Sequence, residues 1–179
     1  MKNVSSSIVE EFITACRDVA ARGLVRCSSG NISQRVDEDE MLLTASRSWL
    51  ERITEEDLVL CRISDGTILE GGTPSVENRF HRGILAGRSD INIVIHFQSP
   101  AATAIACRAD RVVDFNVIPE VPFYIGPIGC VPFIMPGSSD LAEAVANEMI
   151  DHNLALLQNH GEVVVSGDFP HAIQNACFF

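Results

Sequence analysis

Two histidines stand at the ends of apolar, strand-like segments, where an imidazole is unusual. His96 ends the apolar run 93–95, and His160 follows the apolar run 154–157. Side chains alternate along a strand, so His96 and Gln98 are expected to point to the same face. A buried imidazole at such a position needs either a hydrogen-bond partner or a metal ion. Taken alone, each histidine is more often a structural residue than a ligand.

A carboxylate stands four residues before another histidine in a predicted helix. Pro74 and Ser75 open a helix predicted over residues 75–88, which places Glu77 in its first turn. A carboxylate there complements the helix dipole, which is the ordinary interpretation of an isolated glutamate. His81 lies one turn later on the same face, within reach of Glu77. The pair is therefore either a structural hydrogen bond or part of a site.

Small polar loops lie near these candidates along the chain. A glycine-containing loop holds Ser28, Ser29 and Asn31, Ser46 follows the next predicted strand, and Ser75 precedes the predicted helix. Hydroxyl and backbone N–H groups in such loops can bind a phosphate group without any net positive charge. Clusters of serine, glycine and asparagine are more commonly plain turns, so each loop alone is a weak signal.

The composition describes an acidic globular chain. Its 179 residues carry 13 Lys and Arg against 24 Asp and Glu, a formal net charge of −11. Nucleic-acid binding depends on clustered cations, so this balance argues against a nucleic-acid partner. No stretch approaches the roughly 18 apolar residues of a membrane span, and the N-terminus has no apolar signal core. Six cysteines without a C-x-x-C pair are typical of free thiols in a reducing cytosol, so we expect a cytoplasmic protein.

The predicted elements alternate between helices and strands. We expect one domain over residues 1–179, an α/β fold with three α/β/α layers around a central mixed, largely antiparallel sheet. The last predicted helix stops abruptly at Phe179, which suggests that the full protein continues. Helices are predicted over 5–23, 75–88 and 101–107, after a cap at Ser139 and after Pro170, and strands over 41–44, 58–63, 67–70, 91–97, 154–158, 162–165 and part of 121–136.

The order of these motifs resembles the class II aldolase and adducin family. The matching stretches are residues 29–33 (Ser-Gly-Asn-Ile-Ser), 74–81 (Pro-Ser-Val-Glu-Asn-Arg-Phe-His), 94–96 (Val-Ile-His) and 156–161 (Leu-Leu-Gln-Asn-His-Gly). Within that family, the pattern is most similar to the L-fuculose-1-phosphate aldolases. The resemblance covers nearly the whole chain and implies the fold given above.

The resemblance also implies roles for individual residues. Glu77 matches the family's proton-transferring carboxylate, and His96 and His160 match two of its three zinc-binding histidines. Gln98 stands where the third is expected, although an amide oxygen is a poorer zinc ligand than an imidazole. Tyr124 matches a tyrosine that reaches into the site of a neighbouring subunit. The positions that bind the substrate phosphate fall on Ser28, Ser29, Asn31, Ser46 and Ser75.

The activity implied by the resemblance is that of a metal-dependent lyase of carbohydrate metabolism, with Zn²⁺ as the expected cofactor. Its reaction is cleavage of a ketose 1-phosphate, with L-fuculose 1-phosphate as the first candidate, to dihydroxyacetone phosphate and an aldehyde. A partly dry site would raise the pKa of Glu77 toward neutrality. The implied assembly is a homotetramer with active sites between subunits. Two alternatives stay open: a pentulose-phosphate 4-epimerase, and a non-catalytic adducin-like interaction module, which Gln98 would favour.

Overall fold

A computed structural model describes residues 1–108 and 114–179, and its described strands form a single sheet. The strands are β1 (Asn31–Asp37), β2 (Glu40–Thr44), β3 (Leu58–Arg62), β4 (Ile68–Gly71), β5 (Ile93–Phe97), β6 (Ile128–Val131), β7 (Leu154–Leu157) and β8 (Gly161–Ser166). Their order across the sheet is β4-β3-β2-β1-β5-β8-β7-β6. Neighbouring strands are antiparallel except β6 and β7, which are parallel. The predicted mixed, largely antiparallel sheet is confirmed.

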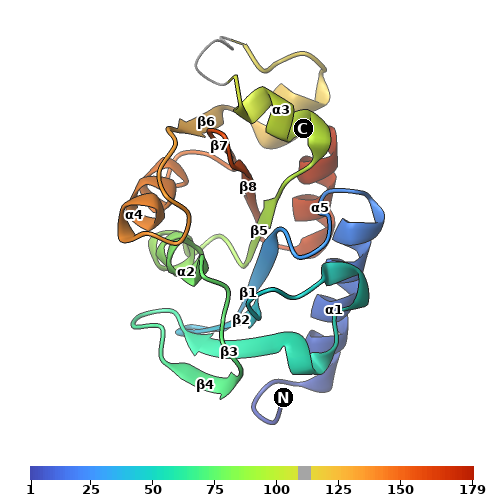
Figure 1. Cartoon of the computed structure of the whole chain (residues 1–179), viewed down its shortest axis with the longest axis vertical. Helices are drawn as coiled ribbons and strands as arrows, with labels where there is room; N and C mark the ends of the chain where they lie inside the picture. The colour runs from blue at the N-terminus through green and yellow to red at the C-terminus, as the bar shows by residue number, and fades with distance from the viewer. Residues whose placement is uncertain (109–113) are drawn as a thin grey trace.

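Helices cover both faces of this sheet (Figure 1). They are α1 (Ser6–Ala21), α2 (Asn78–Gly87), α3 (Pro100–Ala106), α4 (Ser139–Glu148) and α5 (Phe169–Phe178). One hydrophobic cluster joins α1 and α5 to the sheet, with Phe12 and Phe169 in edge contact at 5.9 Å between ring centroids. A second cluster joins α2 and α4 to the other face through Phe80 and Val145. The three α/β/α layers are therefore those predicted from the sequence.

The alternation of side chains along β5 decides which way His96 points. Ile95 and Phe97 belong to the cluster under α1 and α5, whereas Val94 belongs to the cluster under α2 and α4. His96 follows the parity of Val94 and faces α2. There its ring meets Phe80 edge-on, with 5.9 Å between the centroids. The strand thus carries an apolar core on one face and a functional histidine on the other.

Strand β1 is the main element that the sequence analysis missed. It lies between β2 and β5 and pairs with both, so it is a central strand. The prediction placed Asn31 in a turn because Asn31 and Ser33, which share one face of β1, are polar and conceal the expected apolar alternation. Two helix starts also differ from the predictions: α2 begins at Asn78, and Ser138 rather than Ser139 caps α4.

The described residues contain no helix that could span a membrane. None of the helices in 1–108 and 114–179 is long and apolar enough to cross a bilayer.

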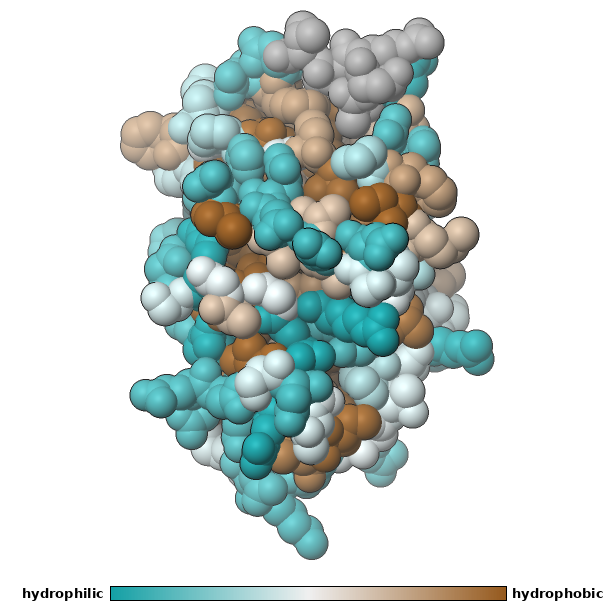
Figure 2. All heavy atoms as spheres, turned by 90° about the vertical axis from the view of Figure 1, so that its left-hand side faces the viewer, coloured by the Kyte–Doolittle hydropathy of each residue, from teal (hydrophilic) through white to brown (hydrophobic). Residues whose placement is uncertain are grey.

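The side of the molecule that carries α2 and α4 is largely hydrophilic, with separate hydrophobic patches between the polar groups (Figure 2). Single exposed apolar residues, among which are Met135 and Phe133, are ordinary on a folded protein.

Candidate active site

A pocket of about 310 Å³ lies beside the ends of β1 and β5 and the loop before α2. Glu77, His96, Gln98 and His160 line it together with the polar loops that precede β1 and follow β2. Residues far apart in the sequence therefore meet in one place, as the resemblance predicts. The predicted phosphate-binding residues that line this pocket are Ser28, Ser29, Asn31, Ser46 and Ser75.

Glu77, His96 and His160 form a compact cluster in the pocket. Nε2 of His160 lies 3.2 Å from Oε1 of Glu77, and Nε2 of His96 lies 3.5 Å from Oε2. One ligand atom from each of the three side chains falls within 4.8 Å of the others. Two imidazole nitrogens and a carboxylate oxygen are ligands that zinc and related divalent cations prefer.

Neighbouring strands bring the two histidines together. His96 lies on β5, which pairs with β8, and His160 immediately precedes β8 in the turn from β7. Nδ1 of His96 donates to the backbone carbonyl of Glu162 over 2.9 Å. This hydrogen bond assigns the proton to Nδ1 and leaves the lone pair of Nε2 directed toward Glu77. The sheet therefore fixes both the position of the ring and its tautomer.

Backbone strain gathers around the pocket. The non-glycine residues with positive φ in the described part of the chain are Cys27 (55°), Arg47 (66°) and Asn159 (55°). Each is next in sequence to a residue that lines the pocket. A left-handed backbone costs a non-glycine residue roughly 1–2 kcal/mol, and such costs concentrate at functional sites. Three independent loops therefore hold costly conformations around the same cavity.

Glu77 is the N-cap residue of α2, which corrects its predicted place in the first helical turn. Its side chain makes no capping hydrogen bond and turns to the histidines instead. The hydroxyl of Ser75 accepts from the backbone N–H of Glu77 over 3.3 Å. The carboxylate is thus used at the pocket and not to stabilise the helix end.

The charge state of Glu77 differs from the one predicted. Burial would raise the pKa of its carboxyl group, but the nearby imidazoles of His96 and His160 and the hydrogen bond from Asn31 outweigh burial and lower the pKa to about 2. The expected pKa near neutrality is therefore wrong for the free chain. Burial lowers the pKa of His96. An ionised carboxylate beside the neutral imidazole of His96 is a combination of protonation states that favours binding of a metal ion.

A further observation supports a divalent cation beside Glu77, His96 and His160. Oε1 of Glu77 is buried and has no hydrogen-bond partner among the described residues, because the nearby Nε2 of His160 lacks hydrogen-bond geometry. A buried carboxylate oxygen normally finds a partner, and the positive charge of a cation bound by the two neighbouring imidazole nitrogens would stabilise it. Gln98 lines the same pocket, and its part as a weak third ligand stays a prediction.

A line of hydrogen bonds stands behind Glu77. Asn31 donates from Nδ2 to Oε2 of Glu77 over 2.8 Å, and its Oδ1 lies 2.5 Å from Nε2 of His81. The other ring nitrogen of His81, Nδ1, lies 2.7 Å from the hydroxyl of Ser33. His81 therefore reaches Glu77 through Asn31 and not directly. Sequence reasoning missed Ser33, although the alternation of Asn31 and Ser33 around an apolar residue was a usable signal.

Tyr124 is the one predicted site residue that does not line this pocket. It lies on the helical turn Val121–Ile125, where the sequence predicted strand and loop, and is 48% exposed. Its ring stacks on Phe178 with 5.3 Å between centroids, and it borders a separate hollow together with His171. Within a single chain, Tyr124 is not brought to the Glu77 cluster, so its predicted role requires a second subunit.

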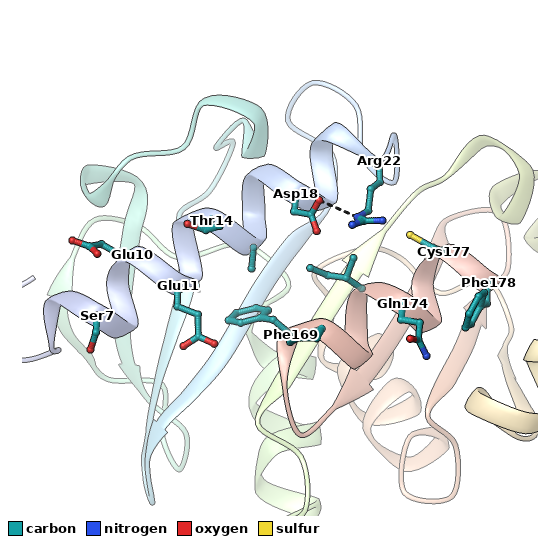
Figure 3. Close-up of a pocket in the computed structure, with 13 residues that line it drawn as sticks. Ser7, Glu10, Glu11, Thr14, Asp18, Arg22, Phe169, Gln174, Cys177 and Phe178 are labelled. Atoms are coloured by element: carbon teal, nitrogen blue, oxygen red, sulfur yellow. Dashed lines mark hydrogen bonds and ion pairs between the residues drawn. The ribbon is translucent and has the colours of Figure 1, made fainter.

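A larger cavity lies elsewhere among the described residues. About 820 Å³ of space lies between α1 and α5, with Glu10 and Glu11 on one side and Phe169 on the other (Figure 3). The ion pair between Arg22 and Asp18 closes part of its rim at 2.9 Å. None of its lining residues is a histidine or a predicted site residue. Its size alone does not mark it as the place of the chemistry.

The backbone is closely packed around Gly161, next to the cluster of Glu77, His96 and His160. A Cβ atom there would lie 2.6 Å from the carbonyl oxygen of Phe97 and 3.1 Å from Cε1 of His96. Gly161→Ala must therefore displace the end of β5, and we expect a loss of roughly 1–3 kcal/mol in the free energy of unfolding, measured in urea. Gly72→Ala is the matched control, because nothing lies within 4 Å of a Cβ there. Equal losses at the two positions would contradict this packing argument.

Glu162 gives the metal-free chain a pH-dependent stability. Burial raises the pKa of its carboxyl group to about 8, and Ser99 and Thr103 oppose this only in part. Both of its oxygens lack a hydrogen-bond partner among the described residues. The unfolded chain, with an ordinary carboxyl pKa, loses this proton first, so the group destabilises the fold increasingly as pH rises from about 4.5 to about 8.

Glu162→Gln should remove that dependence. We expect the variant to exceed the original chain in the free energy of unfolding by up to about 4 kcal/mol at pH 8, and to match it near pH 4.5. Urea unfolding of the metal-free proteins at both pH values measures the difference. Glu56→Gln, at an exposed position, is the control. A gain of the same size at both pH values would contradict the assignment.

Comparison with known proteins places the chain in a family. The family model described as Class II Aldolase and Adducin N-terminal domain matches residues 10–179. The chain belongs to the class II aldolase and adducin family. This confirms the predicted family and its class of metal-dependent enzymes.

Individual members of the class II aldolase family are similar over most of this chain. The 3-oxo-tetronate 4-phosphate decarboxylase of Haemophilus influenzae is 30% identical over 169 residues, which cover 93% of this chain and 80% of that protein. The L-fuculose phosphate aldolase of Escherichia coli is 29% identical over 173 residues, covering 94% of this chain and 77% of that protein. Two relatives that are named for different activities are thus about equally similar to this chain in sequence.

Solved structures of the family confirm the fold. An L-fuculose 1-phosphate aldolase superposes with a TM-score of 0.88 at 25% identity, covering 97% of this chain and 81% of that one. YgbL of Escherichia coli superposes with a TM-score of 0.87 at 29% identity, covering 95% of this chain and 83% of that one. The three-layer arrangement of the class II aldolases is therefore the fold of this chain.

Proposed function

We propose that this class II aldolase family member cleaves a carbon–carbon bond of a phosphorylated sugar and that Glu77 transfers the proton that completes the reaction. The observation that carries the proposal is the cluster in which Nε2 of His96 and of His160 lie 3.5 Å and 3.2 Å from the Glu77 carboxylate. Family membership supports it, because the relatives named above act on phosphorylated sugars or sugar acids. We assign Zn²⁺ as the metal.

The polar loops would hold the phosphate group of the substrate. Serine hydroxyls and backbone N–H groups bind an anion without adding cations, which suits a chain with a net charge of −11. Asn31 can take part because its amide carries two hydrogens and only one of them donates to Glu77. The residues assigned to this task are Ser28, Ser29, Asn31, Ser46 and Ser75.

A divalent metal bound by His96 and His160, with Gln98 as a weaker ligand, would stabilise the negative charge of an enediolate as a Lewis acid. Glu77 moves the proton. Its pKa of about 2 keeps it ionised in the free chain, the protonation state that can accept a C–H proton in the direction of condensation. By microscopic reversibility, the same carboxyl group returns that proton during cleavage. Oε1 is the oxygen we assign to this transfer, because it has no hydrogen-bond partner.

Two substrate classes leave the same three-carbon enediolate. Cleavage of a ketose 1-phosphate such as L-fuculose 1-phosphate releases an aldehyde, whereas decarboxylation of 3-oxo-tetronate 4-phosphate releases CO₂. Protonation of the remaining fragment gives dihydroxyacetone phosphate in both reactions. The Escherichia coli relative favours the aldolase and the Haemophilus influenzae relative favours the decarboxylase. The intact cluster of Glu77, His96 and His160 argues against a non-catalytic interaction module.

A substrate panel tests the proposal and separates the reaction types. The Zn²⁺-loaded chain is incubated with L-fuculose 1-phosphate, L-rhamnulose 1-phosphate, ribulose 5-phosphate and 3-oxo-tetronate 4-phosphate. Dihydroxyacetone phosphate, measured by enzymatic reduction, is the expected product. Free aldehyde identifies an aldolase, CO₂ a decarboxylase, and an isomeric pentulose phosphate an epimerase. No product from any substrate with Zn²⁺, Co²⁺ or Mn²⁺ would overturn the proposal.

The proposed assembly is a homotetramer in which Tyr124 completes the site of a neighbouring subunit. Its exposure and its absence from the pocket of its own chain support this arrangement. Tyr124→Phe should lower turnover by roughly 10²-fold, the usual loss for one acid–base group. Mixed oligomers of Tyr124→Phe and Glu77→Gln subunits should regain part of the activity, because some sites then hold both native residues. No recovery in oligomers shown by mass spectrometry to be mixed would contradict shared sites.

A further inference from the structure

We propose that His81 and Ser33 form a positioning relay that fixes the orientation of the Asn31 amide and thereby selects which oxygen of Glu77 transfers the proton. The inference deepens the proposed function and rests on the role given to Glu77 there. His81 and Ser33 touch neither the pocket nor the candidate metal ligands. They act through Asn31, so they are positioning residues.

The contacts of the relay are continuous from the sheet to the pocket. Ser33 and Asn31 lie two residues apart on one face of β1, and His81 approaches both from α2. The three distances, from Ser33 Oγ to the His81 ring, from the ring to Asn31 Oδ1 and from Asn31 Nδ2 to Glu77 Oε2, are 2.7, 2.5 and 2.8 Å. All are hydrogen-bond distances.

The direction of every hydrogen bond in the relay follows from the amide of Asn31. Its NH₂ group donates to Oε2 of Glu77, and its carbonyl oxygen, which can only accept, faces His81. Nε2 of His81 must then carry a proton in order to donate to that oxygen. Nδ1 is left as an acceptor for the Ser33 hydroxyl. Only one tautomer of His81 and one orientation of Asn31 satisfy all four residues.

Two members of the relay, Ser33 and His81, are shielded from solvent. Ser33 and His81 are both 0% exposed, and the ring of His81 stacks on Phe80 with 4.7 Å between centroids. Bulk water does not reach these two side chains, so breaking one of their hydrogen bonds leaves a buried polar atom without that partner. Burial also lowers the pKa of His81 to about 3, which agrees with a neutral ring.

The relay makes the two oxygens of Glu77 unequal. Oε2 accepts from Asn31, whereas Oε1 has no hydrogen-bond partner among the described residues. An oxygen already held by a donor is less basic and less free to move, so the proton transfers through Oε1. If the amide of Asn31 turned over, its carbonyl oxygen would face the carboxylate and repel it. Holding that amide is the task we assign to His81.

The tautomer of His81 is the first test, and it does not depend on any substrate. Long-range ¹H–¹⁵N spectra of the ¹⁵N-labelled full chain distinguish the Nε2–H from the Nδ1–H form of each histidine. We expect His81, assigned by comparison with His81→Gln, to be the Nε2–H tautomer. An Nδ1–H tautomer or a doubly protonated ring at pH 7 would overturn the relay, even if the enzyme turns over a substrate.

Three variants test the effect on the reaction. His81→Leu keeps the bulk but removes the donor, and should lower kcat roughly 10–100-fold with KM and bound Zn²⁺ unchanged within twofold. His81→Gln keeps a donor near the position of Nε2 and should restore kcat to within about fivefold of the original chain. Ser33→Ala removes only the hydroxyl that donates to Nδ1 of His81 and should give an intermediate loss. His171→Leu, at an exposed histidine, is the control.

The outcomes separate this inference from the proposed function. Equal losses in the Leu and Gln variants, or a loss confined to KM or to metal content, would overturn the positioning role. If His81→Leu does not fold, the Gln and Ala variants and the tautomer still decide the question. If the substrate panel gives no product while His81 is the Nε2–H tautomer, the proposed function fails and the hydrogen-bond relay stands.

Discussion

Replacing Glu77 by glutamine is expected to lower turnover roughly 10³-fold while the bound metal content stays unchanged. Glutamine keeps the shape of the side chain and can still accept the hydrogen bond from Asn31. It cannot take up or release a proton at the carboxyl group. Because His96 and His160 are the groups we assign to the metal, the ion should remain in place.

Two measurements on Glu77→Gln separate proton transfer from binding. Saturating kinetics on the best substrate of the panel should show the loss in kcat with little change in KM. Exchange of solvent deuterium into dihydroxyacetone phosphate should stop as well, since this half-reaction needs only the proton transfer. Glu56→Gln serves as the control at an exposed carboxylate. Full turnover or full exchange with Zn²⁺ bound would remove Glu77 from its assigned role.

The parts of the fold that the sequence predicts are those in which residue type repeats with the period of the element. Strand β5 is an apolar run with β-branched residues, and α1 shows helical spacing of apolar residues between a serine cap and Gly23. Both are found where predicted. Strand β1 was missed because Asn31, which lines the pocket, and Ser33, which contacts His81 behind it, replace the apolar alternation with polar residues on one face of the strand.

Some features of the candidate site could likewise be predicted from the sequence, and others could not. His96, His160 and Glu77 could be brought together from the order of the motifs, because a short ordered pattern carries the arrangement of the family. The pKa of Glu77 could not be predicted from the sequence. It depends on the balance between burial and the two nearby imidazoles, whose distances from the carboxyl group are fixed only in the folded chain. Tyr124 lies outside the pocket of its own chain, and one chain alone cannot show what a second subunit adds.

Replacing His160 by alanine should abolish stable metal binding. Of the residues assigned to the metal, only His96 and the weaker amide of Gln98 would then remain, and we expect the Kd for Zn²⁺ to rise on the order of 10³-fold. The original chain should retain one Zn²⁺ per subunit through gel filtration, whereas the variant should lose it. His171→Ala, at an exposed histidine paired with Asp168, is the matched control and should keep the metal.

Thermal unfolding gives a second readout that needs no substrate. A ligand at 100 times its Kd adds about 2.7 kcal/mol of stability, which for a domain of this size raises Tm by about 5–10 °C. We expect this shift when Zn²⁺ is added to the original chain and to His171→Ala, and its loss in His160→Ala. Equal shifts in all three proteins would place the metal elsewhere.

Gln98 then decides how the centre differs from a site built on three imidazoles. If its amide oxygen is a weak ligand, Gln98→Ala should raise the Kd for Zn²⁺ less than tenfold, far less than His160→Ala does. Gln98→His should lower the Kd, because an imidazole is the better ligand for zinc. The order His160→Ala, then Gln98→Ala, then the original chain, then Gln98→His in increasing affinity is the expected result. A loss in Gln98→Ala as large as in His160→Ala would make the amide an equal ligand of the metal.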